Sequence, residues 1–243
     1  MSCKSEPCRD KLSILLNCGG NMSIRFIEGG QINVKGSLAV QGFIMSANII
    51  CYDNITVAGT GVNMKEKGAI IDCEIYVKNT LHCPSIGNNK GTKTYIQFGY
   101  DKTRNKKIKD LEEALQKVQE AIVVLKSKYS VDITSPNVHM RLKAMTQTEK
   151  EIVIAGIQEK NKLVKQSEML QKILNTELEA RKENYNTSTV QIAQNVFPPI
   201  TLECNNTKRV YDKDLPSSRF YYDADERQID RSRMFGGKDD NRA

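Results

Sequence analysis

The chain has 243 residues, carries a formal net charge of +7, contains no Trp and has only 6% aromatic residues. Its basic residues are spread along the whole sequence, which excludes a surface built mainly to hold nucleic-acid phosphates. No segment approaches the roughly 18 apolar residues of a membrane span, and the N-terminus lacks a basic stretch followed by an apolar one, so we expect a cytoplasmic protein with neither a transmembrane segment nor a secretory signal.

Short strand-type segments separated by glycines fill residues 11–98. The predicted strands are Leu12–Leu16, Gln31–Val34, Ala47–Cys51, Asn54–Val57, Ala69–Val77 and Thr94–Phe98. A polar–Ile–polar–Val unit recurs in three of them, with its isoleucines 23 and then 20 residues apart: Ile32, Ile55 and Ile75. Recurrence at about twenty residues is typical of a solenoid, whereas a β-sandwich, the alternative, would show a turn signal about every 8–12 residues and larger core aromatics. We therefore predict a parallel β-helix over residues 1–100.

Residues 101–184 predict a long antiparallel coiled-coil hairpin. Apolar residues of its first arm alternate in steps of three and four, as in the seam of a coiled coil: Ile108, Leu111, Leu115, Val118, Ile122 and Leu125. We expect this arm to run from Asp101, a suitable N-cap, to about Tyr129. The second arm is expected to run from about His139 to Glu183. Because it is longer and has a broader apolar face, we expect it to contact a second chain as well as the first arm.

The sequence becomes strand-like again from Thr189. Pro198-Pro199 marks a turn or a sheet edge, because proline cannot donate a ladder hydrogen bond. We predict that residues 185–229 are C-terminal strands that pack on the β-helix, with Arg219–Tyr222 as the last of them. Residues 230–243 are charged and show no period, so they predict a disordered tail.

The cysteine pattern indicates reduced thiols. The chain has seven cysteines and no Cys-x-x-Cys pair: Cys3, Cys8, Cys18, Cys51, Cys73, Cys83 and Cys204. An odd number without a secretory signal favours free cysteines, some of them acting as small core residues. We also expect the Asn-x-Ser/Thr sequons to be unmodified. They begin at Asn21, Asn54, Asn186 and Asn205.

Four motifs, taken in their order and spacing, resemble the C-terminal β-helix and coiled-coil region of the flagellar assembly protein A family. Ile27–Gly36 matches a glycine-pair rung of the family's β-helix, and Thr92–Gly99 matches the strand that leads into the coiled coil. Val196–Leu202 matches the segment after the coiled coil, and Ser218–Tyr222 matches the closing strand. The resemblance covers about residues 11–229. It implies a right-handed parallel β-helix interrupted by a long antiparallel coiled-coil hairpin, with the C-terminal strands returning to the β-helix, and an assembly role without catalytic residues. Two departures are Lys102, where the family commonly has Pro, and Pro199 in place of Gly.

No group of residues predicts catalysis, a metal site or a cofactor. His82 and His139 are the only histidines. His82 precedes Cys83, but neighbouring residues on a strand point to opposite faces and cannot share one site without a bulge. His139 is expected to be a solvated residue at the hairpin tip. The glycine pairs lack the strand–loop–helix context of a phosphate-binding motif.

The predicted partner-binding residues lie in the hairpin. A dense basic cluster opens the first arm: Lys102, Arg104, Lys106, Lys107 and Lys109. Positive charges at a helix N-terminus oppose the helix dipole, a mild misfit that points towards binding an acidic protein, nucleic acid or anionic membrane; a solvated face is the preferred interpretation of the cluster. No aromatic residues are interleaved with the cluster, so specific RNA binding is not expected. Ile152 and Ile157, on the broad apolar face of the second arm, complete the predicted set.

These observations predict a non-enzymatic cytoplasmic scaffold or assembly factor that resembles flagellar assembly protein A. We expect it to bind protein partners through its coiled-coil arm and to form a homodimer or a higher oligomer. The alternative is a cytoskeletal protein of the bactofilin type, in which β-helices stack end to end into a polymer.

Overall fold

The computed structural model describes residues 14–59, 68–128 and 145–234. The chain divides into two units. Met1–Asp101 and Lys182–Ala243 together form the solenoid unit, and Lys102–Arg181 forms the hairpin unit.

The described strands of the solenoid unit form two sheets. The first has seven strands, in the order β1 (Leu15–Cys18), β4 (Gln31–Val34), β7 (Asn48–Cys51), β10 (Glu74–Val77), β12 (Thr94–Phe98), β14 (Ile200–Cys204) and β15 (Thr207–Tyr211). The main path of the second has the order β17 (Gln228–Arg233), β16 (Ser218–Asp223), β13 (Thr189–Val196), β11 (Thr80–Ile86), β8 (Ile55–Val57), β5 (Leu38–Val40) and β2 (Met22–Ile24). Beside this path lie β3 (Ile27–Glu28), β6 (Ile44–Met45) and β9 (Ala69–Ile71).

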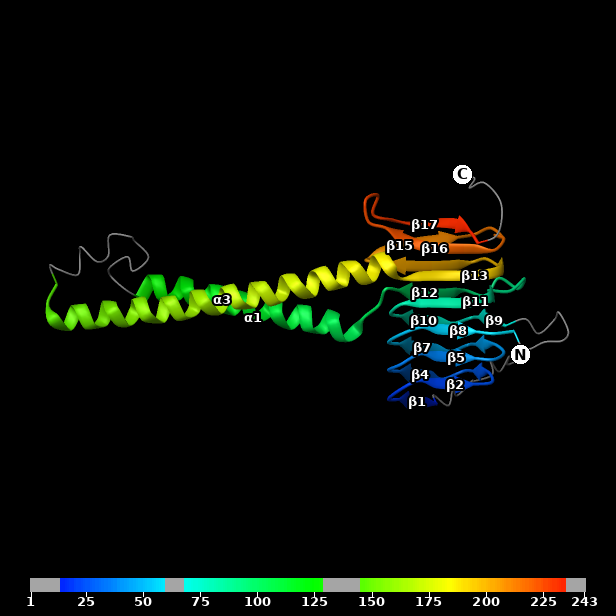
Figure 1. The fold of residues 1–243 in the computed structure, drawn as a ribbon, viewed down its shortest axis with the longest axis horizontal. Coiled ribbons are helices and arrows are strands. Elements are labelled where there is room, and N and C mark those ends of the chain that lie inside the picture. The colour runs from blue at the N-terminus through cyan, green and yellow to red at the C-terminus, as the bar shows by residue number, and fades with distance from the viewer. Residues whose placement is uncertain (1–13, 60–67, 129–144, 235–243) are drawn as a thin grey trace, which may run out of the picture. The chain divides into compact units, whose positions relative to one another are not determined.

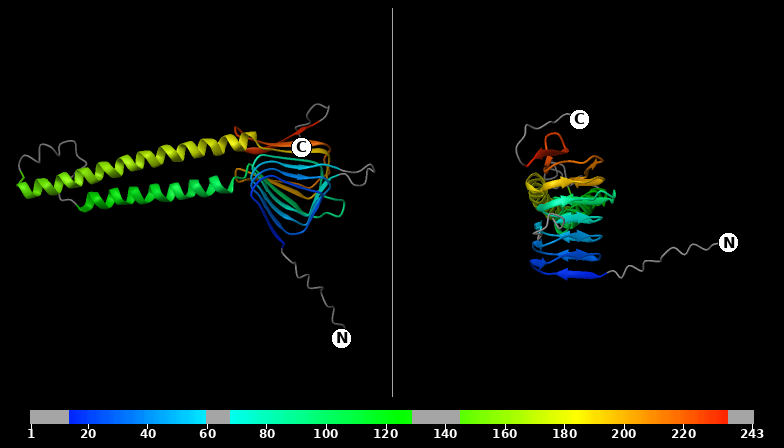
Figure 2. Two further views of the ribbon diagram at one scale, coloured as in Figure 1. Left: turned by 60° about the horizontal axis from the view of Figure 1, so that its bottom comes forward. Right: turned by 90° about the vertical axis from the view of Figure 1, so that its right-hand side faces the viewer.

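Successive coils of this unit stack in parallel, from β1 in blue to β13 in yellow (Figure 1). The right-hand view of Figure 2 shows the same stack from the side. Inward side chains of the first sheet form one apolar ladder. In register, it consists of Leu16, Ile32, Ile49, Ile75, Ile96 and Leu202. Its last five members are at most 6% exposed. Burying each such side chain contributes about 1.5–3 kcal/mol, so the ladder is a main source of stability. The parallel, β-rich architecture predicted from the sequence is confirmed.

The predicted repeat, in contrast, mixes two faces of the solenoid. Ile55 lies on β8 in the second sheet, where it stacks between Leu38 and Leu81. The residue that lies between Ile32 and Ile75 is Ile49, 17 positions after the first and 26 before the second. The polar–Ile–polar–Val pattern occurs on both sheets because both need an alternating strand. Its recurrence at about twenty residues is therefore not the coil length.

Polar side chains at one corner join consecutive coils. The side-chain oxygen of Asn21 accepts a hydrogen bond from the backbone N–H of Ser37 at 2.9 Å, and that of Asn54 accepts from Thr80 at 3.1 Å. Asp53 accepts a further bond from the amide of Asn79 at 2.7 Å. Satisfying these backbone groups where the ladder turns is a structural role for two of the four sequon asparagines.

The parallel winding ends at the C-terminal side with antiparallel strands. β15 pairs antiparallel with β14, and β16 pairs antiparallel with both β13 and β17. β17 covers Gln228–Arg233, whereas the sequence predicts a disordered tail from residue 230. The prediction fails here because only Ile229 is fully buried in this polar strand, and one apolar residue produces no pattern.

Two helices pack antiparallel in the hairpin unit. They are α1 (Lys102–Lys128) and α3 (Gln147–Thr187), with 27 and 41 residues. Ile108 and Leu115 of α1 pack with Leu174, in the second half of α3, and Leu125 packs with Val153, near the beginning of α3. Neither of these described helices is apolar enough to cross a membrane.

The start of α3 differs from the prediction. The helix begins at Gln147, and the predicted start, His139, lies outside the described residues. Thr146 and Glu149 form a capping box: the Glu149 carboxylate accepts from the Thr146 N–H at 2.8 Å, and the Thr146 hydroxyl accepts from the Glu149 N–H at 3.4 Å. Because this motif satisfies N–H groups that have no partner within the helix, it fixes the start at this position.

The last turn of α3 belongs to the solenoid unit. The buried amide of Asn184 donates to the backbone carbonyls of Lys78, at 3.1 Å, and of Gly99, at 3.0 Å. Gly99 has a φ of +72°, and a Cβ there would lie 2.7 Å from the ring of Tyr185. These contacts fix the point at which the chain rejoins the parallel strands.

Candidate interaction surface of the helical hairpin

The basic cluster of α1 is partly used within the hairpin. Arg104 Nε lies 3.3 Å and Lys107 Nζ 2.5 Å from the carboxylate of Glu177 on α3. Arg104 also donates to the backbone carbonyl of Ala180 at 3.4 Å. The hydrogen bond from Lys107, followed by the Lys107 charge and the contacts with Arg104, lowers the pKa of Glu177. Two of the five predicted basic residues thus hold the helices together.

The other three residues of the cluster face solvent. Lys109 lies 3.9 Å from Glu113, one turn further along the same helix, and such exposed pairs contribute about 0.3–0.5 kcal/mol. Lys102 and Lys106 are exposed, and no ion pair is formed by either within the part of the chain that the structure describes. These three ammonium groups remain accessible to an acidic partner.

The two predicted isoleucines lie in different surroundings. Ile157 is partly buried against the Leu125–Val153 contact between the helices. Ile152 is 56% exposed. Further exposed aliphatic side chains occur next to both residues of that contact, at Val123, Val124 and Ile154. We call the exposed residues on either side of this contact, Val123, Val124, Ile152 and Ile154, the apolar flank of the hairpin. Only Ile152 was predicted from the sequence.

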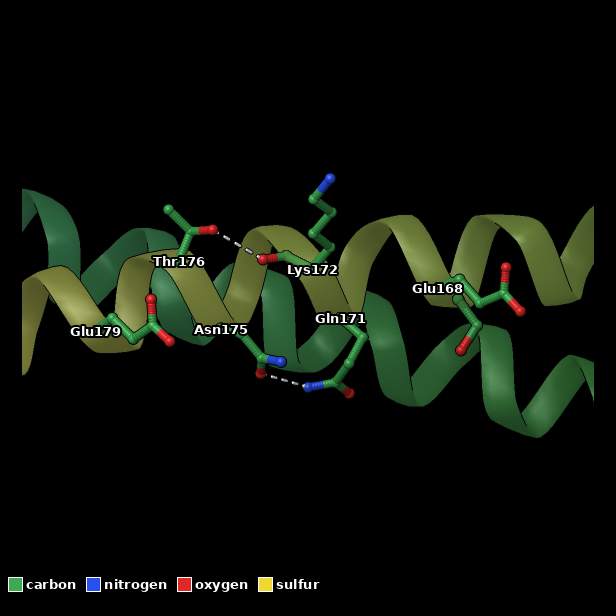
Figure 3. A pocket seen from close by; sticks show the side chains of 7 residues that line it. Glu168, Gln171, Lys172, Asn175, Thr176 and Glu179 are labelled. Carbon is green, nitrogen blue, oxygen red and sulfur yellow. Dashed lines mark hydrogen bonds between the residues drawn. The ribbon is translucent and has the colours of Figure 1, made fainter.

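A shallow polar hollow of about 540 Å³ lies along α3 (Figure 3). Among the described residues, its lining comes from this helix alone. The Gln171 amide donates to the Asn175 side chain at 2.9 Å, and the Thr176 hydroxyl donates to the Lys172 carbonyl at 3.1 Å. A hollow with walls from a single helix does not bring polar groups together from several directions, as a small-molecule site requires.

The buried cysteines lack the character of nucleophiles. Burial raises the pKa of Cys73 to about 11, and it also raises the pKa values of Cys51, Cys83 and Cys204. A thiol of high pKa carries little reactive thiolate at neutral pH. Within residues 14–59, 68–128 and 145–234, no three His, Cys, Asp or Glu side chains lie close enough to hold a metal ion.

His82 lies on β11, where it is in register with Gln191 on β13 and Thr56 on β8. Its neighbour Cys83 is fully buried in the core. His139, the other histidine, lies outside the described residues.

Comparison with known proteins gives one match. No curated protein and no solved structure matches the chain. The sequence model of the Flagellar Assembly Protein A beta solenoid domain matches residues 9–229. This range includes the described parallel coils, α1, α3 and the returning strands up to the start of β17, and it confirms the resemblance seen in the sequence motifs. The chain therefore belongs to the Flagellar Assembly Protein A (FapA) beta solenoid domain family.

Proposed function

We propose that this chain is a non-enzymatic cytoplasmic scaffold that contributes to flagellar assembly and binds a protein partner on its helical hairpin. Family membership supports the flagellar role. The apolar flank supports the binding role, because large aliphatic side chains that stay exposed beside a contact between two helices are available to a protein partner. It is the observation on which the proposal rests.

The finer features of the architecture belong to the same proposal. We infer a right-handed β-helix and coiled-coil packing of α1 against α3. Steps of three and four separate Ile108, Leu111 and Leu115, which pack against α3, and a further contact with α3 forms at Leu125; both observations support the coiled coil. The right-handed winding is supported by the resemblance to the family.

Docking on the apolar flank combines two kinds of contact. The aliphatic side chains of Val124 and Ile152 would lose water on binding, at about 25 cal/mol for each Å² of apolar surface buried. The exposed ammonium groups of Lys102, Lys106 and Lys109 lie near the start of α1, far along the helix from Val124, where they would attract acidic residues of an elongated partner. The expected partner therefore presents an apolar helix or groove and carries acidic residues.

A charge introduced into the apolar flank tests this role. Ile152→Glu, introduced into the chromosomal gene of the bacterium of origin, is expected to reduce the number of flagella per cell in electron micrographs. It should also reduce the distance that the cells swim in soft agar. Gln158→Glu is the matched control, since it adds the same charge at an exposed position of α3 without removing an apolar side chain. Circular dichroism of both purified variants should match that of the wild type.

Replacing residues 102–181 with a short linker gives the decisive comparison. Normal flagella in that strain would refute the proposed role of the hairpin. Loss of flagella in both the linker strain and the Ile152→Glu strain, with normal flagella in the Gln158→Glu strain, would support it.

One observation favours the second candidate, a bactofilin-like polymer. At the first coil that the structure describes, Leu16 is 38% and Leu15 58% exposed, although Leu16 occupies a ladder position. Such an end favours stacking on another copy. The antiparallel strands β15 and β17 at the other end oppose continued head-to-tail stacking. Fibres of the purified protein in electron micrographs would support the polymer, and a salt-stable dimer in light scattering would support the scaffold.

A further inference from the structure

A row of tyrosines lies on the outward face of the seven-stranded sheet. Along β10 and β12, the inward residues are fully buried, so Tyr76 and Tyr95 must point outward. The strands are adjacent, and the two rings lie 5.8 Å apart between centroids, inclined by 59°. Tyr100 follows β12 and extends the row, at 5.0 Å from Tyr76 and inclined by 53°.

Two carboxylates border this row. Glu74 accepts a hydrogen bond from the Tyr76 hydroxyl, and Glu203 accepts one from the Tyr95 hydroxyl at 3.0 Å. Burial, with help from these hydrogen bonds, raises the pKa values of both tyrosines, so their phenols stay protonated and donate. Neither carboxylate forms an ion pair with another described residue. The row therefore combines aromatic rings with two carboxylates, of which Glu74 also accepts from the Asn48 amide at 3.1 Å and Glu203 has Lys208 opposite it on β15.

The chain itself places a cation on one of these rings. Lys208 of β15 lies in register with Glu203, and its ammonium group is 5.6 Å from the centroid of Tyr95. This distance is within the range of about 6 Å over which a ring face attracts a cation. The contact shows that a positive side chain fits against the ring beside the Glu203 carboxylate.

We propose that the row formed by Tyr76, Tyr95 and Tyr100, with Glu74 and Glu203, docks an arginine-bearing segment of a protein partner. Guanidinium groups stack on aromatic faces and pair with carboxylates through two parallel hydrogen bonds, so this surface supplies both of their preferred contacts. The net charge of +7 repels a basic segment elsewhere, which makes the local negative charge selective. A sugar chain is a poorer fit, because the inclined rings form no flat stacking platform.

The surface differs from the apolar flank in its chemistry and in the unit that carries it. The two can therefore be tested separately, and failure of one proposal leaves the other standing.

A fluorescein-labelled hexa-arginine peptide serves as the probe, with binding followed by fluorescence anisotropy of the full chain at low salt. Glu203→Gln removes the charge but keeps an acceptor for the Tyr95 hydroxyl, and Tyr76→Ala removes a ring. Each is expected to weaken binding about three- to fivefold, whereas Tyr76→Phe, which keeps the ring face, should weaken it less than Tyr76→Ala. Glu159→Gln, at an exposed position of α3 in the hairpin unit, removes an equal charge that is not part of the row and should leave the affinity unchanged.

Several outcomes would overturn the proposal. One is the absence of hexa-arginine binding, and another is equal affinity for wild type and Glu203→Gln. Equal weakening by Glu203→Gln and Glu159→Gln would mean that only general charge attraction is measured, which also refutes the site. Binding of cellohexaose that Tyr76→Ala abolishes, without peptide binding, would assign the row to a sugar. Because Glu203→Gln preserves size and hydrogen bonding, the proposal remains testable if Tyr76→Ala does not fold.

Discussion

Asn184 is expected to contribute more to the stability of the solenoid unit than any exposed residue of the same helix. Its side chain is buried, and its amide donates to two backbone carbonyls, at 3.1 and 3.0 Å. In Asn184→Ala both carbonyls lose the donor that Asn184 supplies. Each lost hydrogen bond costs about 1–1.5 kcal/mol, and alanine's better helix propensity returns about 0.5 kcal/mol. The expected loss in the free energy of unfolding is therefore about 2 kcal/mol.

Asn186→Ala is the matched control, since Asn186 is exposed two residues further along α3. Its effect on the free energy of unfolding should stay within about 0.5 kcal/mol of zero. Urea denaturation followed by tyrosine fluorescence measures both variants, because the chain contains no Trp to mask the signal. If the two variants unfold at the same urea concentration with equal slopes, the two hydrogen bonds of Asn184 do not stabilise the fold and the reasoning is wrong.

Three further results are expected. Leu115→Asp places a charge between the helices beside Leu174, so the helical circular dichroism signal should fall, and an unchanged signal would contradict the packing. Gly99→Ala forces a side chain into a positive φ and against Tyr185, so the thermal midpoint should drop by several degrees; a midpoint equal to that of the wild type would refute the close contact. Burial raises the pKa of Cys73 from 9.0 to about 11, so the folded state keeps a proton that the unfolded chain releases. The free energy of unfolding should therefore be unaffected by this thiol below pH 9 and should fall progressively between pH 9 and about 11. Cys73→Ala should make this fall in the urea midpoint smaller, and an unchanged fall would contradict the reasoning.

The strands that sequence reasoning located best are those with clean alternation. Gln31–Val34 and Thr94–Phe98 have the predicted bounds because each alternates inward apolar with outward polar residues. Shorter strands such as Leu38–Val40 were missed, since three residues cannot establish a period. Ala69–Val77 was predicted as one strand, but the backbone turns at Asp72, which has a φ of +54°. The sequence gives no sign of this turn, because the residue is not a glycine.

The sequence could not show which strands pair with one another in successive coils, for a physical reason. Ile32 and Ile55 have the same local pattern, yet they lie on different sheets of the solenoid. Only the pairing of whole strands distinguishes them, and that depends on corners of unequal length. A local pattern gives the face of a residue within its strand but not which strand is its neighbour.

The candidate site was only partly readable for a similar reason. The basic residues of α1 stand out in the sequence, but the partner of Lys107 is Glu177, 70 positions away. The packing of the two helices was therefore needed to tell which basic side chains form ion pairs within the hairpin and which stay exposed. The tyrosine row was missed because Tyr76, Tyr95 and Tyr100 are scattered in the sequence and meet only across strands.

The insertion of two long helices between neighbouring strands constrains the order in which the nascent chain can fold. Ile96 on β12 must pair with Leu202 on β14, more than a hundred residues later. Closing a flexible loop of that length would cost on the order of 4 kcal/mol of chain entropy. Pairing of α1 with α3 joins residues that are closer in sequence, and it shortens the flexible loop between β12 and β14. The entropy cost of pairing these strands is therefore lower if the helices form before the final coil. A chain released before Thr189 would leave the open edges of β11 and β12 exposed to aggregation, which makes complete synthesis of the C-terminal strands a condition for solubility.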